Sequence, residues 1–137
     1  MATMTKPTLD HIGIAVRSIE AASIYAALGL EIDHVEVVET QQVRTAFLSV
    51  GDSNLELLEP LSDDSPVAKF ISKRGEGIHH ICFRVSNLDE ELLRLEKKGF
   101  RLINRVGVPG AHGCRIAFLH PAAGNGVLIE LSEKAGD

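Results

Sequence analysis

Two histidines and two glutamates stand at matching places in this 137-residue chain. His11 lies in LDHIGIAV, His80 in IHHICFRV, Glu56 in LELLEPL and Glu130 in GVLIEL. A carboxylate within an apolar strand is costly unless it is exposed, paired or bound to a metal ion. Two imidazoles and two carboxylates without a thiolate form a mixed N/O ligand set that suits Mn, Co, Ni, Fe or Zn. The sequence therefore predicts one divalent-metal site with room for water or a chelating substrate.

An internal repeat relates these positions. The matching segments, in the same order in both halves, are 9–16 with 78–85, 44–48 with 115–119, and 55–57 with 129–131. Helix-like stretches follow Ser18 and Asn87, and each ends at a glycine. Asn87 with Glu90 three residues later is a capping-box pattern. Each half is therefore predicted to form a βαβββ module, and the fold class is α+β.

Strand periodicity indicates how the four side chains are presented. Alternate strand residues lie on opposite faces, so the apolar neighbours of each His and Glu pack on one face and the polar side chain lies on the other. If a pseudo-twofold axis relates the halves, the four groups meet near it. Two alternatives remain: two buried His–Glu hydrogen-bonded pairs without a metal, or chance similarity between two amphipathic βα units.

We expect one domain over residues 1–137, with module 1 at 8–60, a connector helix at 61–77 and module 2 at 78–132. Within the connector, Ser65 followed by Pro66 is typical of a helix start. In module 1 the second strand is predicted at 31–39. Its counterpart near Leu102–Val106 is less clearly marked.

Composition argues against several classes of protein. The chain is 45% hydrophobic and 24% charged, as in an ordinary globular protein. A formal net charge of -5 argues against nucleic-acid binding. No apolar run approaches the roughly 18 residues of a membrane span, and Met1–Thr8 resembles neither a secretory signal nor a transit peptide. With only Cys82 and Cys114, a reducing compartment and a cytoplasmic location are expected.

These segments resemble the vicinal oxygen chelate (glyoxalase I-like) superfamily, in which paired βαβββ modules form a metal-binding cup. The resemblance covers residues 8–132 and is greatest to the methylmalonyl-CoA epimerases. It is carried by LDHIGIAV, LELLEPL followed by DSPVAKFI, GIHHICFRV, GAHG, FLHP and GVLIEL. The DSPVAKFI connector and the GAHG…FLHP run are the most specific of these segments.

The resemblance implies an isomerase of propionate metabolism that interconverts (2R)- and (2S)-methylmalonyl-CoA. Abstraction of the α-proton would give a metal-stabilised enolate. Glu130 is the first candidate base and Glu56 is the second. The expected cofactor is a divalent ion (Co, Mn, Ni, Zn or Mg), and the expected partners are an acyl-CoA substrate and a second copy of the chain, as a homodimer. Some relatives carry an additional glutamate, assigned as a base, at the position of Thr45. Thr45 cannot perform that role and Glu39 is out of register, so the second base is left open.

Other polar residues are candidates for substrate contacts or for structural roles. The predicted substrate-binding residues are His112 and Gly113, in the glycine-bounded loop, and Arg115. Further candidate cations for CoA are Arg44, Arg84, Arg101 and Arg105. Among the remaining histidines, His79 and His120 are interpreted as structural and His34 as solvated.

Two other functions fit the same pattern. Lactoylglutathione lyase (glyoxalase I) shares the ligand set, but FLHPAAGNG replaces its usual DPDG-type turn. A non-catalytic small-molecule-binding member of the superfamily is the second alternative. An extradiol-type oxygenase ranks last, because Glu56 would crowd its site of two histidines and one glutamate.

Overall fold

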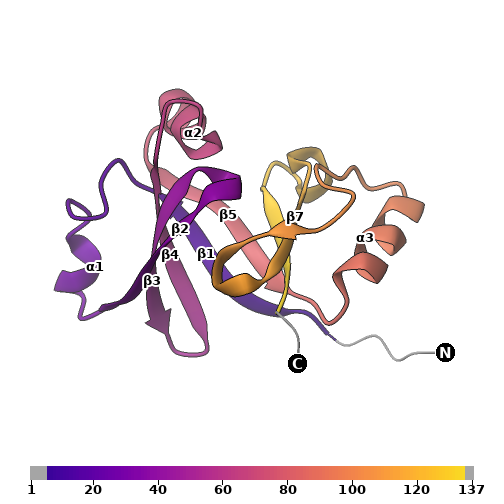
Figure 1. The fold of residues 1–137 in the computed structure, drawn as a ribbon, viewed down its shortest axis with the longest axis horizontal. Coiled ribbons are helices and arrows are strands. Elements are labelled where there is room, and N and C mark those ends of the chain that lie inside the picture. Colours follow the sequence, from indigo (N-terminus) through magenta and orange to yellow (C-terminus); the bar gives the residue numbers. More distant parts are fainter. Residues whose placement is uncertain (1–5, 135–137) are drawn as a thin grey trace. The chain divides into compact units, whose positions relative to one another are not determined.

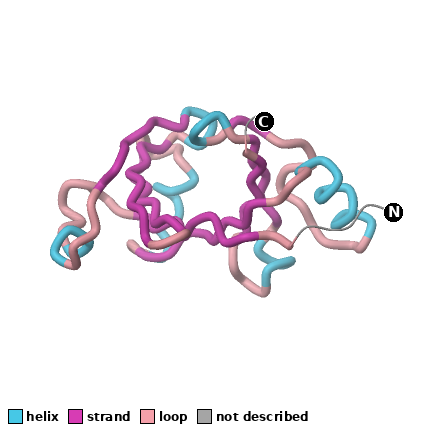
Figure 2. The backbone as a smooth tube through the Cα atoms, turned by 90° about the horizontal axis from the view of Figure 1, so that it is seen from below, coloured by secondary structure: helices cyan, strands magenta, loops and turns pink. Residues whose placement is uncertain are grey.

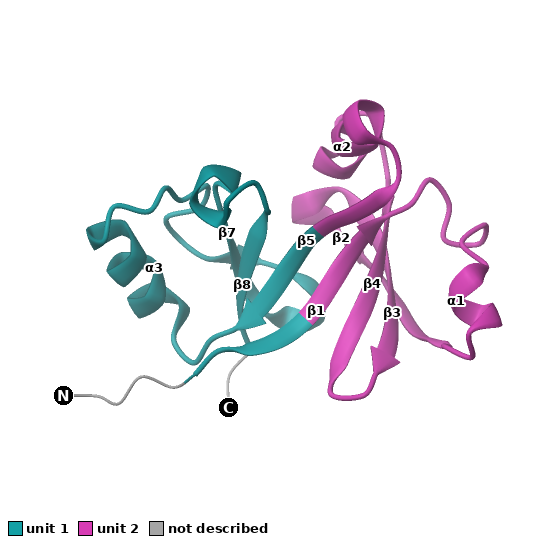
Figure 3. Cartoon of the chain, turned by 180° about the vertical axis from the view of Figure 1, so that it is seen from behind, with its two compact units in different colours: residues 1–10, 80–137 teal, residues 11–79 magenta. Residues whose placement is uncertain are grey.

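The computed structural model describes residues 6–134, which fall into two compact units (Figure 3). Unit 2 is His11–His79, and unit 1 contains the residues on either side of it. The chain passes from unit 1 into unit 2 within strand β1 (Thr8–Ala15) and returns within strand β5 (Gly77–Arg84). Each unit contains its own strands, helices and hydrophobic core.

Unit 2 contains the first repeat and the connector (Figure 1). After β1 come α1 (Ile24–Ala27), β2 (Ile32–Val38), a 3₁₀ turn (Glu39–Gln41), β3 (Val43–Val50), β4 (Ser53–Pro60) and α2 (Pro66–Arg74). The strand order is β2-β3-β4-β1, with β4 parallel to β1 and the other neighbours antiparallel. The strand predicted at 31–39 is thus present as β2.

Unit 1 repeats this order with a weaker second strand. After β5 come α3 (Leu88–Lys97), β6 (Val108–Pro109), a 3₁₀ turn (Ala111–Gly113), β7 (Arg115–Leu119), a second 3₁₀ turn (Pro121–Gly124) and β8 (Ile129–Glu133). The order is β5-β8-β7-β6, with β8 parallel to β5. The segment near Leu102–Val106 contributes one bridge, from Leu102 to Leu119. Figure 2 distinguishes the strands from these short helical segments, and the α+β fold class is confirmed.

One face of each strand set forms the hydrophobic core. In unit 2 the buried cluster comprises Val16, Ile19, Ala46, Leu48 and Leu57. In unit 1 it comprises Val85, Leu88, Leu92, Ala117, Leu119 and Leu131. Because strand side chains alternate, the residues between these positions lie on the opposite face. That opposite face presents the polar residues of interest.

The helix starts follow the capping chemistry expected from the sequence. The Asn87 side chain accepts a hydrogen bond from the backbone N–H of Glu90 at 3.1 Å, and that of Ser65 accepts one from Val67 at 3.2 Å. The first helix is shorter than the stretch after Ser18 predicts. The backbone N–H of Ser23 donates to the carbonyl of Ala21, only two residues back, and this interrupts the i→i−4 ladder. Among the described residues, no helix has the length and apolarity needed to cross a membrane.

An arginine clamp occurs at the same place in both repeats. Arg44 on β3 contacts Glu20 at 2.9 Å and Glu59 at 3.3 Å. Arg115 on β7 contacts Asp89 at 2.8 Å and Glu133 at 3.2 Å. In each case the arginine joins the segment that follows the first strand to the neighbouring strand of the sheet. The clamp lies on the core side. Arg115 and Glu133 are directly paired, and each lies two residues from a core residue, Ala117 or Leu131, and so shares its face.

The unit 1 clamp predicts a pH-dependent stability difference. The hydrogen bond from Arg115 holds the pKa of Asp89 below its ordinary value of 3.8. A carboxyl whose pKa is lowered by folding stabilises the folded state at any pH above its ordinary, unfolded-state pKa. This stabilisation is lost as the pH falls through the pKa of the folded state. Arg115→Gln should therefore lower the thermal unfolding midpoint at pH 7, and the difference from the wild type should shrink towards about pH 3.

The matched control is Arg105→Gln, because Arg105 pairs with Glu96 but its side chain is 81% exposed. Circular dichroism melts at several pH values measure the effect. An equal shift from Arg115→Gln at neutral and acid pH would show that packing of the arginine stem matters and its charge does not.

Candidate active site

Unit 2 holds a buried histidine–glutamate pair on the face opposite its core. His11 and Glu56 are only 6% and 8% exposed. Nδ1 of His11 lies 2.9 Å from Oε2 of Glu56. The parallel register of β1 and β4 explains the contact, because His11 pairs with Asn54 and Gly13 pairs with Glu56. Gly13 beside Glu56 has no side chain, so the imidazole and the carboxylate can meet diagonally across the two strands.

Unit 1 holds the equivalent pair. His80 and Glu130 are 4% and 5% exposed, and Nε2 of His80 lies 2.9 Å from Oε1 of Glu130. Here Cys82 pairs with Glu130 in the parallel register of β5 and β8. Phe118 on β7 pairs with Glu130 on its other side, and its ring meets the His80 ring edge to face at 5.9 Å. Phe47 holds the corresponding place beside Glu56 in unit 2.

Each pair offers ligand types that a divalent cation accepts. A buried carboxylate needs hydrogen bonds or a positively charged partner. The imidazole nitrogen beside it is a second ligand atom of a kind that binds Mn, Co, Ni and Zn. The flanking aromatic side chains and Cys82, which is fully buried, limit access of water. The structure therefore shows one His–Glu contact in each unit. The prediction that the two pairs form one metal site stays a prediction.

A second acidic residue lies on the same face of unit 2 as Glu56. Glu36 on β2 is directly opposite Thr45 on β3, and Thr45 is opposite Leu58 on β4. Directly paired residues present their side chains on the same face of a sheet. Leu58 is two residues from Glu56 on β4, so both lie on the face opposite the core residue Leu57. Glu36 could not be placed on this face from the sequence, because a bulge between Ile32 and His34 shifts the register of β2. The signal available was the alternation of His34, Glu36 and Val38 in that segment.

The predicted substrate residues fall in different places. His112 and Gly113 are exposed and lie in a loop with left-handed backbone conformations, φ 57° and 70°. Arg115 lies on the core face of β7, on the side opposite Phe118 and Glu130, where Asp89 and Glu133 hold it. The structure therefore does not bring Arg115 to the face of His80 and Glu130. As substrate contacts, His112 and Gly113 stay predictions.

Most of the other candidate residues have local structural partners. Arg84 pairs with Asp10 at 2.6 Å, and Arg105 pairs with Glu96 at 3.2 Å. His79 meets the ring of Phe70 edge to face at 5.0 Å. Nδ1 of His120 accepts a hydrogen bond from the backbone N–H of Ala122, which starts a 3₁₀ turn. The structural interpretation of both histidines agrees with these contacts.

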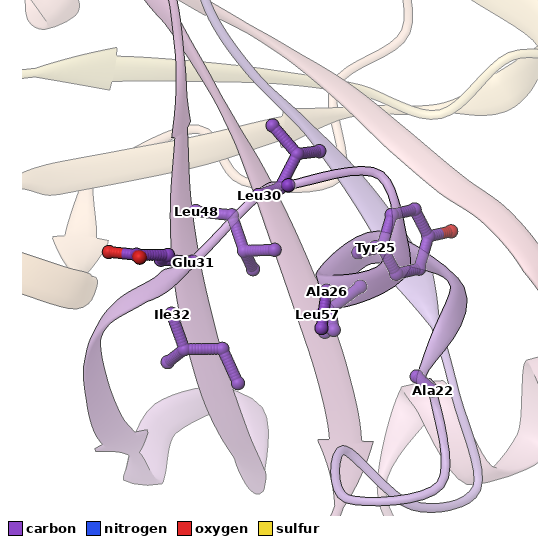
Figure 4. Close-up of a pocket in the computed structure, with 9 residues that line it drawn as sticks. Ala22, Tyr25, Ala26, Leu30, Glu31, Ile32, Leu48 and Leu57 are labelled. Atoms are coloured by element: carbon purple, nitrogen blue, oxygen red, sulfur yellow. The ribbon is translucent and has the colours of Figure 1, made fainter.

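A separate pocket of about 450 Å³ lies on the core side of unit 2 (Figure 4). It is lined by Ala22, Tyr25, Ala26, Gly29, Leu30, Glu31, Ile32, Leu48 and Leu57. Leu57 is the strand neighbour of Glu56 and lies on the opposite face. This pocket is therefore not part of the polar face that carries the His–Glu pair.

Comparison with known proteins shows the family to which the chain belongs. Residues 10–118 match the family model of the glyoxalase/bleomycin resistance protein/dioxygenase superfamily. With this match over most of its length, the chain belongs to that superfamily.

Relatives narrow the assignment. The uncharacterised protein YqjC of Bacillus subtilis is 50% identical over 94% of this chain and 94% of its own length. The human mitochondrial methylmalonyl-CoA epimerase is 37% identical over 91% of this chain and 73% of its own. A substituted form of the Streptomyces coelicolor methylmalonyl-CoA epimerase, solved with 2-nitronate-propionyl-CoA, has a TM-score of 0.88 and 41% identity and covers 98% of this chain and 97% of that one. Within the superfamily, the chain groups with the methylmalonyl-CoA epimerases.

The two His–Glu contacts predict a stability effect in the absence of any metal. Glu56→Ala or Glu130→Ala leaves a buried imidazole without its carboxylate partner, and we expect each to lower the free energy of unfolding by about 1–3 kcal/mol. Urea unfolding in the presence of a chelator measures this. Glu96→Ala, at an exposed ion pair, is the control and should stay within about 0.5 kcal/mol of the wild type. Unchanged or higher stability in both buried variants would contradict the importance of these contacts in the metal-free fold.

Proposed function

We propose that the protein is a metal-dependent epimerase that interconverts (2R)- and (2S)-methylmalonyl-CoA. The observation that carries the proposal is the buried His–Glu pair in each repeat of a chain that groups with the methylmalonyl-CoA epimerases. One solved relative is in complex with a propionyl-CoA analogue. This supports a CoA thioester as the substrate class.

We further propose that the two pairs bind one divalent ion. His11 and Glu56 supply one half of the ligand set, and His80 and Glu130 supply the other half. Two imidazoles and two carboxylates suit cobalt, manganese, nickel or zinc, with magnesium as a weaker fit because it prefers oxygen ligands. The bound ion supplies positive charge where negative charge accumulates as the substrate loses its α-proton.

The side chains of the protein must move the proton. The reacting carbon lies between a thioester and a carboxylate, so loss of its proton leaves an electron pair delocalised onto both groups. Inversion requires that one group removes the proton from one side and that another returns a proton to the opposite side. Glu130 is the first candidate for one of these roles and Glu56 the next, because they are the carboxylates of the proposed substrate site.

The reaction is tested by isotope exchange. Purified protein incubated in D₂O with (2S)-methylmalonyl-CoA and a divalent metal should incorporate deuterium at C2 and convert the substrate to a mixture of both epimers. Glu130→Gln should lower the rate by about 100-fold or more, the usual effect of losing a general base. Absence of both exchange and racemisation by the wild-type protein would exclude this activity. Turnover of a glutathione hemithioacetal by the same preparation would support the glyoxalase I alternative.

Metal binding is tested separately by thermal stability. A ligand present at about 100 times its Kd stabilises the folded state by about 2.7 kcal/mol. Manganese or cobalt should raise the unfolding midpoint of the wild type, and both His11→Ala and His80→Ala should abolish the shift. His34→Ala is the control, because its ring is about half exposed and it belongs to neither pair. Loss of the shift in one buried-histidine variant with full retention in the other would show that the pairs do not share an ion.

Assembly and location complete the proposal. We propose a homodimer in the cytoplasm. Neither cysteine forms a disulfide within the described residues, in keeping with a reducing compartment. Light scattering of the purified chain measures its mass in solution and so tests the dimer.

A further inference from the structure

We infer that Glu36 is a catalytic residue of this epimerase and acts as the second proton-transfer group. The inference rests on the proposed function. It concerns the side of the substrate that faces β2 and β3, for which the sequence analysis left the base open. No residue of β3 can act there, because Val43, Thr45, Phe47 and Ser49 on the polar face all lack a group that accepts a proton near neutral pH.

The strand register places Glu36 on the required face. His34, Glu36 and Val38 on β2 are paired with Phe47, Thr45 and Val43 on β3. Phe47 and Thr45 are in turn paired with Glu56 and Leu58 on β4. The side chains therefore form two adjacent rows across β2, β3 and β4. One row is His34, Phe47 and Glu56, and the other is Glu36, Thr45 and Leu58.

The two rows lie at adjacent positions on the polar face of unit 2. Neighbouring strands lie about 5 Å apart, so β2 and β4 are separated by about 10 Å with β3 between them. Thr45 and Phe47, which are 1% and 6% exposed, form the floor of this strip. Thr45 stands between Glu36 and Leu58 in one row, and Phe47 stands between His34 and Glu56 in the other.

The surroundings of Glu36 suit proton transfer with exchange to solvent. Its side chain is 29% exposed, so it is neither fully buried nor freely solvated. Nε2 of His34 lies 3.4 Å from Oε1 of Glu36, and the His34 ring stacks on Phe47 with centroids 5.8 Å apart. His34 is 52% exposed. The histidine thus links the carboxylate to bulk water and holds it on the polar face.

The Glu36 carboxylate takes the α-proton, an O–H bond forms as the C–H bond breaks, and the electron pair moves onto the thioester and carboxylate oxygens of the substrate. A second, protonated group then delivers a proton to the opposite face of the carbon, and under the proposed function Glu130 is the first candidate for this role. Exchange with water restores both carboxyl groups.

The neighbouring acidic residues differ from Glu36 in ways that make them controls. Asp33, in the bulge, accepts hydrogen bonds from both the backbone N–H and the hydroxyl of Ser49, at 3.0 and 2.6 Å. Glu39 follows β2 in a 3₁₀ turn and is exposed. Glu39→Gln therefore makes the same chemical change three residues away, outside the polar strip.

The test measures α-proton exchange and epimerisation separately for each epimer of methylmalonyl-CoA in D₂O. The full chain is used with its metal content and thermal midpoint checked. For Glu36→Gln we expect interconversion to fall by about 100-fold or more, while one epimer still exchanges its proton through the remaining base and the other does not. Glu39→Gln should match the wild type in both measurements. Glu36→Asp, which keeps a carboxylate, should retain more activity than Glu36→Gln.

Two results would overturn the inference alone: wild-type interconversion by Glu36→Gln, or equal loss of exchange from both epimers with metal binding intact. The second result would indicate a general effect on substrate binding rather than the loss of one of two bases. A wild-type protein that exchanges neither epimer would overturn the proposed function and this inference together.

Discussion

The structure depends on a buried carboxylate that each repeat places opposite its own hydrophobic core. Glu56 and Glu130 are almost inaccessible to solvent, and each is flanked along its strand by apolar side chains that pack on the other face. Burial of an ionised group is tolerated only with a close polar partner. That partner is the histidine on the neighbouring parallel strand, at 2.9 Å in both units. The parallel pairing of first and last strands in each repeat therefore brings each histidine to its glutamate.

The two faces of the strands in each unit hold different kinds of contact, and the same two kinds occur in both units. On the core face, Arg44 and Arg115 are each held by two carboxylates. On the polar face, Phe47 and Phe118 each lie beside the buried glutamate. The phenylalanine follows the arginine by three positions in both strands, so strand alternation assigns them to opposite faces. A change on the core face can therefore alter stability without touching the groups proposed to bind metal and substrate.

Sequence alone predicted much of this because its strongest signals were periodic and repeated. The shared polar face of each histidine and its glutamate follows from strand alternation, and α3 with its Asn87 cap and α2 with its Ser65 cap follow from local capping chemistry. That the four side chains bind one metal ion stays a prediction. The failures have equally local causes. The helix predicted after Ser18 begins only at Ile24, because a tight turn precedes it at Ser23. The bulge near Asp33 shifts the register of β2, so the face of Glu36 could not be derived from the sequence. Arg115 was predicted to contact substrate because repeat position alone does not reveal which face a charged side chain occupies.

The repeats differ most in their second strand, and this difference bears on mechanism. In unit 2 that strand is seven residues long and brings Glu36 to the polar face. In unit 1 the corresponding segment is reduced to one bridge and the two-residue β6, followed by the loop of His112 and Gly113. Epimerisation itself is nearly symmetric, because either face of the reacting carbon must gain or lose a proton. The substrate is not symmetric, since one arm is a small carboxylate and the other a long thioester. Under the proposed function, this unlike pair of repeats, with an added carboxylate on an ordered strand in one and an exposed loop with left-handed residues in the other, would serve a substrate with two unlike arms.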